Sequence, residues 1–171
     1  MNMMESTAQS SGKPVSDRDE DPKEATESAK SLDEFIAFRI RDDEFCISIN
    51  IVREIRRWTP ATRLPHSPPY LKGVVNLRGA VVPVIDFSAR LDGPETVTTE
   101  RHTIIIFETE GRTIGLLVDS VSDIFAADTQ TLQPLSQVAP QADVDVISGV
   151  FVIEDRILRV VTVDNIIARD E

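Results

Sequence analysis

Few residues of this 171-residue chain have the types and spacing that catalysis requires. The two histidines, His66 and His102, lie in a proline-rich turn and at the start of an expected strand. Neither has an evident nucleophile partner in the sequence, whereas general acid–base catalysis needs a partner within hydrogen-bonding reach. The glycines are scattered and form no phosphate-binding loop. We therefore expect a protein that is not an enzyme.

The other reactive or metal-binding side chains favour structural roles. Cys46 is the only cysteine, so no intrachain disulfide can form, which suits a reducing cytoplasm. No local base would activate its thiol, so we expect a small packing residue. Asp119 with Asp123, or Asp143 with Asp145, could bind a hard cation, but neither set has the spacing of an EF-hand. We expect solvated carboxylates, no metal and no cofactor.

Charge is distributed unevenly along a chain whose formal net charge is −11. Residues 1–33 hold eight acidic and four basic residues and few large apolar ones, so we expect a disordered acidic tail. Residues 53–78 hold six basic residues against one acid, Glu54. This region fits an acidic partner surface. A small barrel that binds nucleic acid remains an alternative, although such a barrel needs a basic groove with stacking aromatic side chains.

Nothing in the sequence indicates a membrane span or a secretion signal. No apolar run approaches the roughly 20 residues that cross a bilayer, and the N-terminus lacks the apolar segment of a signal peptide. We expect a soluble, cytoplasmic protein that makes no direct membrane contact.

The longest apolar, β-branched region is residues 73–87, interrupted once by the polar group at 76–79. This pattern predicts a strand, a tight turn and a second strand. Gly79 can take a positive φ, and the amide of Asn76 can bond nearby backbone. Pro83 favours an edge strand or a bulge. Arg78, beside the turn, is either a solvated arginine or the partner of a carboxylate.

Other patterns predict further strands and a few helical turns. Residues 51–57 have helical or turn spacing, Ser67 is expected to cap a helical turn that ends at Gly73, and Asp164 to cap a helix over 165–169. A linker is expected over 88–100 and an irregular loop over 130–140. The expected strands are 35–40, 45–49, 61–64, 102–107 and 113–118.

The second half of the chain repeats the first in the same order. Residues 45–55 align with 114–124, with Asn or Asp matching at the sixth place and an acid at the tenth. Gly73-Val74 recurs as Gly149-Val150, and 84–86 as 162–164. Short strands at regular spacing in two similar units predict an all-β fold of two small barrels. We place them at residues 34–92 and 93–171.

Three motifs resemble the CheW family, the adaptors of bacterial chemotaxis signalling: Val-Arg-Glu-Ile at 52–55, Pro-Pro-Tyr-Leu-Lys-Gly-Val-Val-Asn-Leu-Arg-Gly at 68–79, and Val-Pro-Val-Ile-Asp-Phe at 82–87. The match covers about residues 34–168. It implies two SH3-like five-stranded barrels with short helical segments. It also implies a non-enzymatic scaffold that couples methyl-accepting chemoreceptors to a CheA-type histidine kinase in an array. A CheV-like coupling domain without its receiver is the alternative in this class.

The resemblance also implies residue roles. Glu54 and Arg78 are expected to pair and to affect receptor coupling, and the receptor's helical tip is expected in an apolar groove between the barrels. The kinase regulatory domain is expected to dock barrel end to barrel end. Candidate receptor-coupling residues are Val52, Glu54, Ile55, Gly73, Asn76, Arg78, Gly79 and, placed on the opposite wall from the repeat, Val121. Candidate rim residues are Arg53, Arg56, Arg57 and Trp58.

Overall fold

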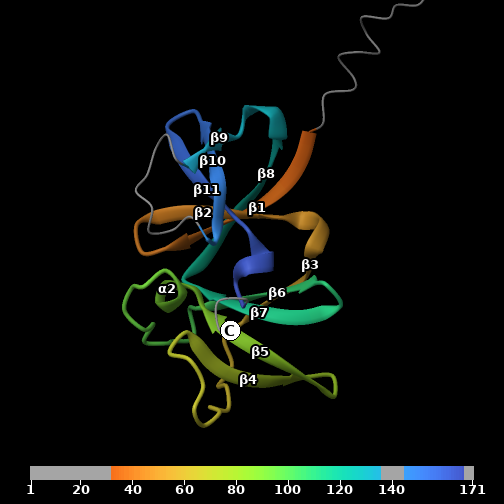
Figure 1. Cartoon of the computed structure of the whole chain (residues 1–171), viewed down its shortest axis with the longest axis vertical. Helices are drawn as coiled ribbons and strands as arrows, with labels where there is room; N and C mark the ends of the chain where they lie inside the picture. Colours follow the sequence, from red (N-terminus) through yellow and green to blue (C-terminus); the bar gives the residue numbers. More distant parts are fainter. Residues whose placement is uncertain (1–31, 136–144, 168–171) are drawn as a thin grey trace, which may run out of the picture. The chain divides into compact units, whose positions relative to one another are not determined.

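Two mixed β-sheets, each built from strands of both halves of the sequence, make up the fold (Figure 1). The computed structural model describes residues 32–135 and 145–167. Sheet A has the strand order β8-β1-β2-β11-β10-β9, and sheet B has the order β3-β6-β7-β5-β4. The expected all-β class is confirmed, with six strands rather than five in sheet A, because the short β9 pairs with β10. Closure into SH3-like barrels stays a prediction.

The strands are short, and the helical segments are single turns. Sheet A contains β1 (Leu32–Ile40), β2 (Asp43–Ser48), β8 (Ser120–Asp128), β9 (Gln133–Pro134), β10 (Ile147–Ile153) and β11 (Arg156–Val161). Sheet B contains β3 (Val52–Arg57), β4 (Leu71–Leu77), β5 (Ala80–Asp86), β6 (Thr103–Thr109) and β7 (Arg112–Val118). The helical turns are η1 (Ile49–Ile51), α2 (Phe87–Arg90), η2 (Thr129–Thr131) and η5 (Val163–Asn165).

The repeat is present in the strand pairing, but the two sheets do not coincide with the two halves of the sequence. The third strand of each half pairs with the first strand of the other half, β3 with β6 and β8 with β1. Sheet B therefore comes from residues 52–118, whereas sheet A combines residues 32–48 with 120–161. The expected boundary between residues 92 and 93 falls between strands of the same sheet.

The pairing registers define equivalent positions in the two halves. Val84 lies opposite Gly115 in the parallel pair β5–β7, and Val160 lies opposite Cys46 in the parallel pair β11–β2. Val84 thus corresponds to Val160. The sequence alignment of 84–86 with 162–164 paired Val84 with Thr162, so it was off by two residues. On the exchanged strands, Glu54 and Asp123 each follow a register shift at the same place.

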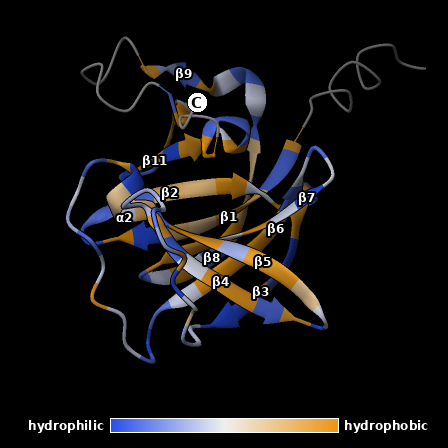
Figure 2. Ribbon diagram, turned by 60° about the horizontal axis from the view of Figure 1, so that its bottom comes forward, coloured by the Kyte–Doolittle hydropathy of each residue, from blue (hydrophilic) through white to orange (hydrophobic). Residues whose placement is uncertain are grey.

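Three apolar clusters hold the sheets together. One lies within sheet A, one within sheet B, and the largest, which we call the inter-sheet core, contains residues of both. Figure 2 shows the apolar strands that form them. Phe87 of α2 joins the inter-sheet core, with its ring centroid 5.7 Å from that of Phe38 and 5.1 Å from that of Phe45. Cys46 is buried in the sheet A cluster, while Phe45 and Ile47 belong to the inter-sheet core, so both faces of β2 are covered.

Two sequence predictions about strand and helix are wrong. Residues 52–57 form strand β3 rather than a helical segment, because pairing with β6 satisfies their backbone groups. Strand β5 lies between β7 and β4, so the edge-strand alternative for Pro83 is wrong, whereas the β4–β5 register does shift one residue away, between Leu71 and Gly73 of β4. Pro83 is tolerated there because the N–H and carbonyl of its β4 partner Val74 bond Thr62 instead, and pairing with β7 begins one residue later.

The predicted caps are also wrong. Residues 69 and 70 form a turn and β4 begins at Leu71, while the Ser67 hydroxyl donates to the carbonyl of Leu64. Asp164 accepts a hydrogen bond from Thr109 instead of capping a helix. Of the predicted tail 1–33, residues 32 and 33 begin β1, and residues 1–31 lie outside the described part. The predicted loop over 130–140 lies partly outside it.

Candidate functional site

A contact between Glu54 and Arg78 joins the two edges of sheet B. Arg78 Nη1 lies 2.7 Å from Glu54 Oε2. Glu54 is on edge strand β3, and Arg78 is in the turn between β4, the other edge strand, and β5. The sheet therefore curls far enough for side chains from its two edges to touch. The expected contact is present, but the Arg78 side chain is 74% exposed, and not partly buried.

The turn geometry holds Arg78 outward. Arg78 and Gly79 have φ angles of 53° and 88°, as a two-residue hairpin turn between twisted strands requires. The Asn76 Oδ1 atom accepts a hydrogen bond of 2.9 Å from the Gly79 amide, which fulfils the role predicted for Asn76. Arg78 thus occupies a backbone conformation that non-glycine residues seldom adopt, and the turn fixes where its guanidinium can reach.

The residues of β3 alternate in burial. Val52 packs against the inter-sheet core, Glu54 is half-buried, and Ile55 is 43% exposed. Val52 and Ile55 therefore differ in exposure, and do not share one buried apolar face. Val121 is the structural counterpart of Val52, because each lies opposite a phenylalanine just before the register shift. Both valines pack against the inter-sheet core.

Gly73 has a structural requirement of its own. Its φ is 147°, and a Cβ atom there would lie 2.5 Å from the carbonyl oxygen of Thr62. The backbone of Thr62 pairs with Val74 through two hydrogen bonds of 2.8 Å. Only glycine permits this close approach of the preceding loop to β4.

The candidate rim residues are largely neutralised. Arg53 pairs with Glu108, and Arg56 lies 4.0 Å from Glu54. Trp58 packs half-buried against the sheet B cluster, so its ring is not free for stacking. Arg57 is exposed at the end of β3. The basic region is thus a set of ion pairs more than an open cationic groove, which does not favour the nucleic-acid alternative.

A second arginine–carboxylate contact, which the sequence reading missed, lies on sheet A. Arg156 lies 3.1 Å from Asp123 and 2.8 Å from Glu44. The hydrogen bonds that Arg156 donates to Asp123, and after them the one to Glu44, raise the pKa of its guanidinium. Asp123 occupies the position that corresponds to Glu54. The sequence did contain a signal for this contact, because Glu54 and Asp123 are both acids at the tenth place of the repeat.

Asp119 and Asp123 do not converge on a cation site. Asp119 accepts a hydrogen bond of 2.6 Å from the Arg41 amide and lies 3.4 Å from His102 Nε2, while Asp123 binds Arg156. Asp143 lies outside the described residues. Within residues 32–135 and 145–167, no three His, Cys, Asp or Glu side chains gather as metal ligands would. His66 is exposed in a turn.

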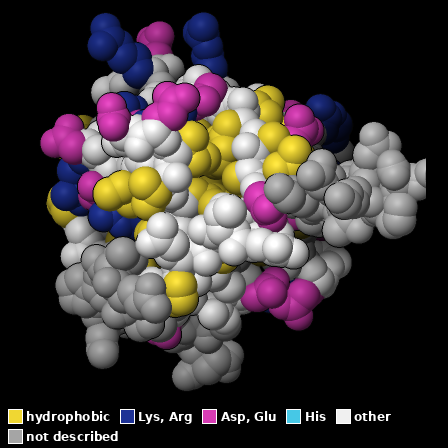
Figure 3. Space-filling model, turned by 90° about the horizontal axis from the view of Figure 1, so that it is seen from above, with side chains coloured by type: hydrophobic (Ala, Val, Ile, Leu, Met, Phe, Trp, Pro, Cys, Tyr) yellow, Lys and Arg dark blue, Asp and Glu magenta, His cyan; other side chains and the backbone are white. Residues whose placement is uncertain are grey.

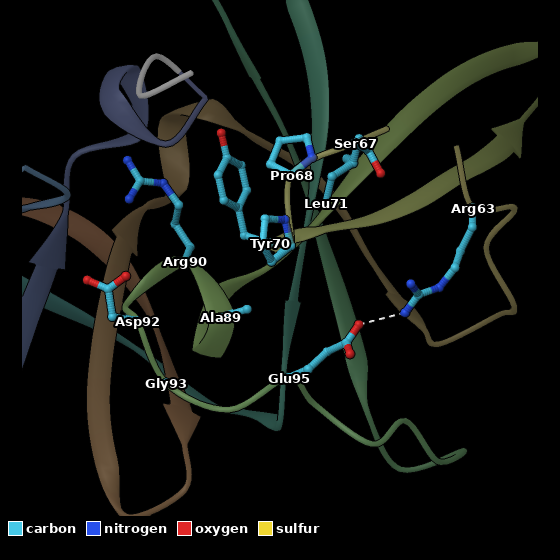
Figure 4. Close-up of a pocket in the computed structure, with 11 residues that line it drawn as sticks. Arg63, Ser67, Pro68, Tyr70, Leu71, Ala89, Arg90, Asp92, Gly93 and Glu95 are labelled. Carbon is cyan, nitrogen blue, oxygen red and sulfur yellow. Dashed lines mark hydrogen bonds and ion pairs between the residues drawn. The ribbon is translucent and has the colours of Figure 1, made fainter. Parts of the chain in front are cut away.

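An open cavity of about 640 Å³ lies beside Tyr70. Figure 4 shows the Tyr70 ring between Arg90 and Pro68, with Arg63 bound to Glu95 across the opening. Arg90 is buried and donates to the backbone carbonyls of Ile166 and Asn165, each at 2.7 Å. Its guanidinium lies 5.3 Å from the Tyr70 ring centroid. Arg90 thereby fixes the last described turn to α2.

Exposed apolar side chains lie on sheet A as well as on sheet B. The large ones on sheet A are Leu32, Ile124, Val152 and Ile157. Figure 3, which views the molecule from above, shows hydrophobic side chains gathered among acidic ones. Val152 and Ile157 are direct cross-strand partners.

Comparison with known proteins agrees with this architecture. The profile of the CheW-like domain matches residues 34–171. The chain is 47% identical over 138 residues to "Chemotaxis protein CheW" of Rhizobium meliloti, covering 81% of this chain and 89% of that protein. It is 32% identical to the protein of the same name from Bacillus subtilis, covering 85% and 93%.

A solved structure shows the same fold. The scaffolding protein TtCheW from Thermoanaerobacter tengcongensis superposes with a TM-score of 0.71 at 24% identity, covering 77% of this chain and 90% of that one. By its fold, this chain is a two-sheet β-protein of the same class. It belongs to the CheW-like domain family, as the sequence motifs indicated. None of the helices in the described part is long and apolar enough to cross a membrane.

Proposed function

We propose that this protein is a non-enzymatic adaptor that couples the cytoplasmic tips of methyl-accepting chemoreceptors to the regulatory domain of a CheA-type histidine kinase. It would act in the cytoplasm, reach the membrane only through these partners, and bind no cofactor or nucleic acid. The observation that carries the proposal is the Glu54–Arg78 contact, which is exposed, geometrically fixed by its turn and placed where two sheet edges meet.

The receptor contact is proposed at the side chains around this pair. Val52 and Val121 occupy equivalent places beside the inter-sheet core and would supply apolar surface to a helix laid between the sheets. Ile55 and Arg57 are exposed on β3 and would contact the same helix from its edge. Gly73, Asn76 and Gly79 would act indirectly, by shaping β4 and the turn that carries Arg78. Arg53, Arg56 and Trp58 would form the rim.

The kinase contact is proposed at exposed apolar surface on the sheets. A regulatory domain with a similar pair of sheets could meet this chain through related faces. The exposed Val152 and Ile157 on sheet A support such a contact, because adjacent apolar side chains on a strand pair form a continuous surface.

The test is reconstitution with receptor fragments and a CheA-type kinase from the same organism. Co-sedimentation and kinase autophosphorylation would be measured with wild-type protein, Arg78→Ala and Arg63→Ala. Arg63 is a matched control, since it is also highly exposed and bound to one glutamate, Glu95, at 2.6 Å. We expect loss of receptor control with Arg78→Ala alone. If neither partner sediments with the wild-type protein, the adaptor proposal fails.

A further inference from the structure

An apolar hollow on sheet B has an occupied counterpart on sheet A. The hollow has a volume of about 420 Å³ and is lined by β5, β7, the segment before β4 and Ile167. It shares Pro68, Tyr70 and Leu71 with the cavity in Figure 4, where these residues form one wall. It contains neither Glu54 nor Arg78.

The registers of the two halves relate this hollow to a smaller one. Pro83 corresponds to Arg159, Ile114 to Phe45 and Arg112 to Asp43. The three counterparts line a hollow on sheet A of about 180 Å³, less than half the volume. Leu91 after α2 and Ile167 after η5 take matching places in the two. The two hollows thus occupy equivalent places in the two halves, and the one on sheet A is partly filled by a side chain.

Arg159 is what fills the site on sheet A. Its guanidinium carbon lies over the Phe45 ring, 5.4 Å from the ring centroid, so the Arg159 side chain covers the apolar floor. Its charge is balanced by Asp43, whose Oδ1 atom lies 3.4 Å from Nη1. The plug therefore has two parts, a side chain laid over the apolar floor and a charge that meets Asp43 at the start of the neighbouring strand β2.

On sheet B both parts of the plug are missing, and the charge is inverted. Pro83 has no stem that could cover Ile114, and the residue at the place of Asp43 is Arg112. In the part of the chain that the structure describes, the Arg112 side chain makes no hydrogen bond or ion pair. Val81 on the same face of β5 is 68% exposed. The side chain that would complete this site has an apolar stem and ends in an anion.

We propose that this hollow, lined by Pro83, Ile114 and Arg112, is a docking site for a partner-protein segment that presents a carboxylate beside a large apolar side chain. The carboxylate meets Arg112, and the apolar side chain covers Ile114 and Val81. The extra volume relative to sheet A accommodates the second side chain. This docking site does not depend on the Glu54–Arg78 contact, so it stands or falls separately from receptor coupling.

The test is a methyl-detected NMR titration of the full chain with a short probe peptide, acetyl-Gly-Leu-Glu-Gly-amide. Two matched peptides replace Glu by Gln or Leu by Ser. We expect saturable shifts of the Val81 and Ile114 methyl groups with a dissociation constant of about 1 mM, and no shift of Ile157, the counterpart of Val81. The Gln peptide should bind about three to five times more weakly, as expected for loss of an exposed ion pair.

A double variant that fills the hollow provides a second test with the same NMR measurement. The double variant Pro83→Arg with Arg112→Asp rebuilds the Arg159–Asp43 arrangement inside the hollow and should abolish the shifts, whereas Ile124→Ala, at an exposed side chain of sheet A with no proposed partner, should leave them unchanged. Equal binding of the Glu and Gln peptides, or no saturable shift, overturns the proposal. Shifts that depend on protein concentration alone would assign the hollow to a second copy. Contacts from residues 1–31 would assign it to the chain's own tail. Either result also overturns the proposal.

Discussion

At the scale of single residues, two arginine–carboxylate contacts at related places differ in burial. Arg78 is 74% exposed and meets one carboxylate, whereas Arg156 is 33% exposed and meets two. Water and salt screen the exposed contact, so it contributes little to folding. The contact of Arg156 ties β11 to β2 and β8 within sheet A and is the more structural of the two. Arg78 is accordingly the one of the two arginines that we propose for contact with a partner protein.

Arg78→Ala should lower the free energy of unfolding by less than about 1 kcal/mol, because the exposed pair gains little over solvation. Urea denaturation measures this change, with Arg63→Ala as the matched exposed pair. Arg156→Ala should cost more than either. A large loss of stability in Arg78→Ala would make that residue mainly structural and would remove the basis for its role in coupling.

Cys46 should be unreactive in the folded protein. Burial raises the pKa of its thiol to about 12, against a weaker opposing effect from Arg156. The unfolded thiol titrates near 9, so the unfolded state loses its proton first, and the contribution of Cys46 to stability falls as pH rises from about 9 to 12. Stability measured against pH should therefore decline less in Cys46→Ala. Rapid alkylation of the native protein at neutral pH would contradict the burial of the thiol.

At the scale of elements, the hairpin of β4 and β5 was predictable because its information is local. Gly79 and Asn76 specify the turn, and β-branched residues flank it. Strand β3 was not, because residues 52–57 are held by pairing with β6, about fifty residues later. A local pattern contains no record of such a partner. The Glu54–Arg78 contact was predicted through family motifs, whereas the contact of Arg156 with Asp123 and Glu44 was missed.

Gly73→Ala tests the close approach between β4 and the preceding loop. A methyl group there would meet the Thr62 carbonyl at a positive φ, so we expect a loss of roughly 1–3 kcal/mol in the free energy of unfolding. Gly79→Asn is the control, since nothing lies within 4 Å of a Cβ at that position and asparagine tolerates positive φ. Equal stability of the two variants would show that the loop moves aside at no cost.

At the scale of the whole molecule, the exchanged strands make each sheet depend on both halves. Strands β3, β4 and β5 of sheet B come from the first half and β6 and β7 from the second, while sheet A combines β1 and β2 of the first half with β8, β9, β10 and β11 of the second. The inter-sheet core adds contacts from both sheets and from α2. Neither sheet can lose its edge without exposing part of this shared core.

Unfolding should therefore be a single cooperative transition. Trp58, the only tryptophan, reports on the sheet B cluster through its fluorescence, whereas far-ultraviolet circular dichroism reports on both sheets. We expect the two signals to change together in urea. Two separated transitions would mean that the sheets are independent despite the exchange.

The exchange also sets an order of events during synthesis. All strands of sheet B have left the ribosome once residue 118 has emerged, but β1 and β2 wait for β8, β10 and β11. Elongation runs at roughly 5–20 residues per second, so the β1–β2 hairpin lacks its neighbouring strands for seconds. Its open edges and the apolar residues Phe38 and Phe45 are then available to chaperones or to neighbouring nascent chains. The first hairpin to be made is the last to be enclosed.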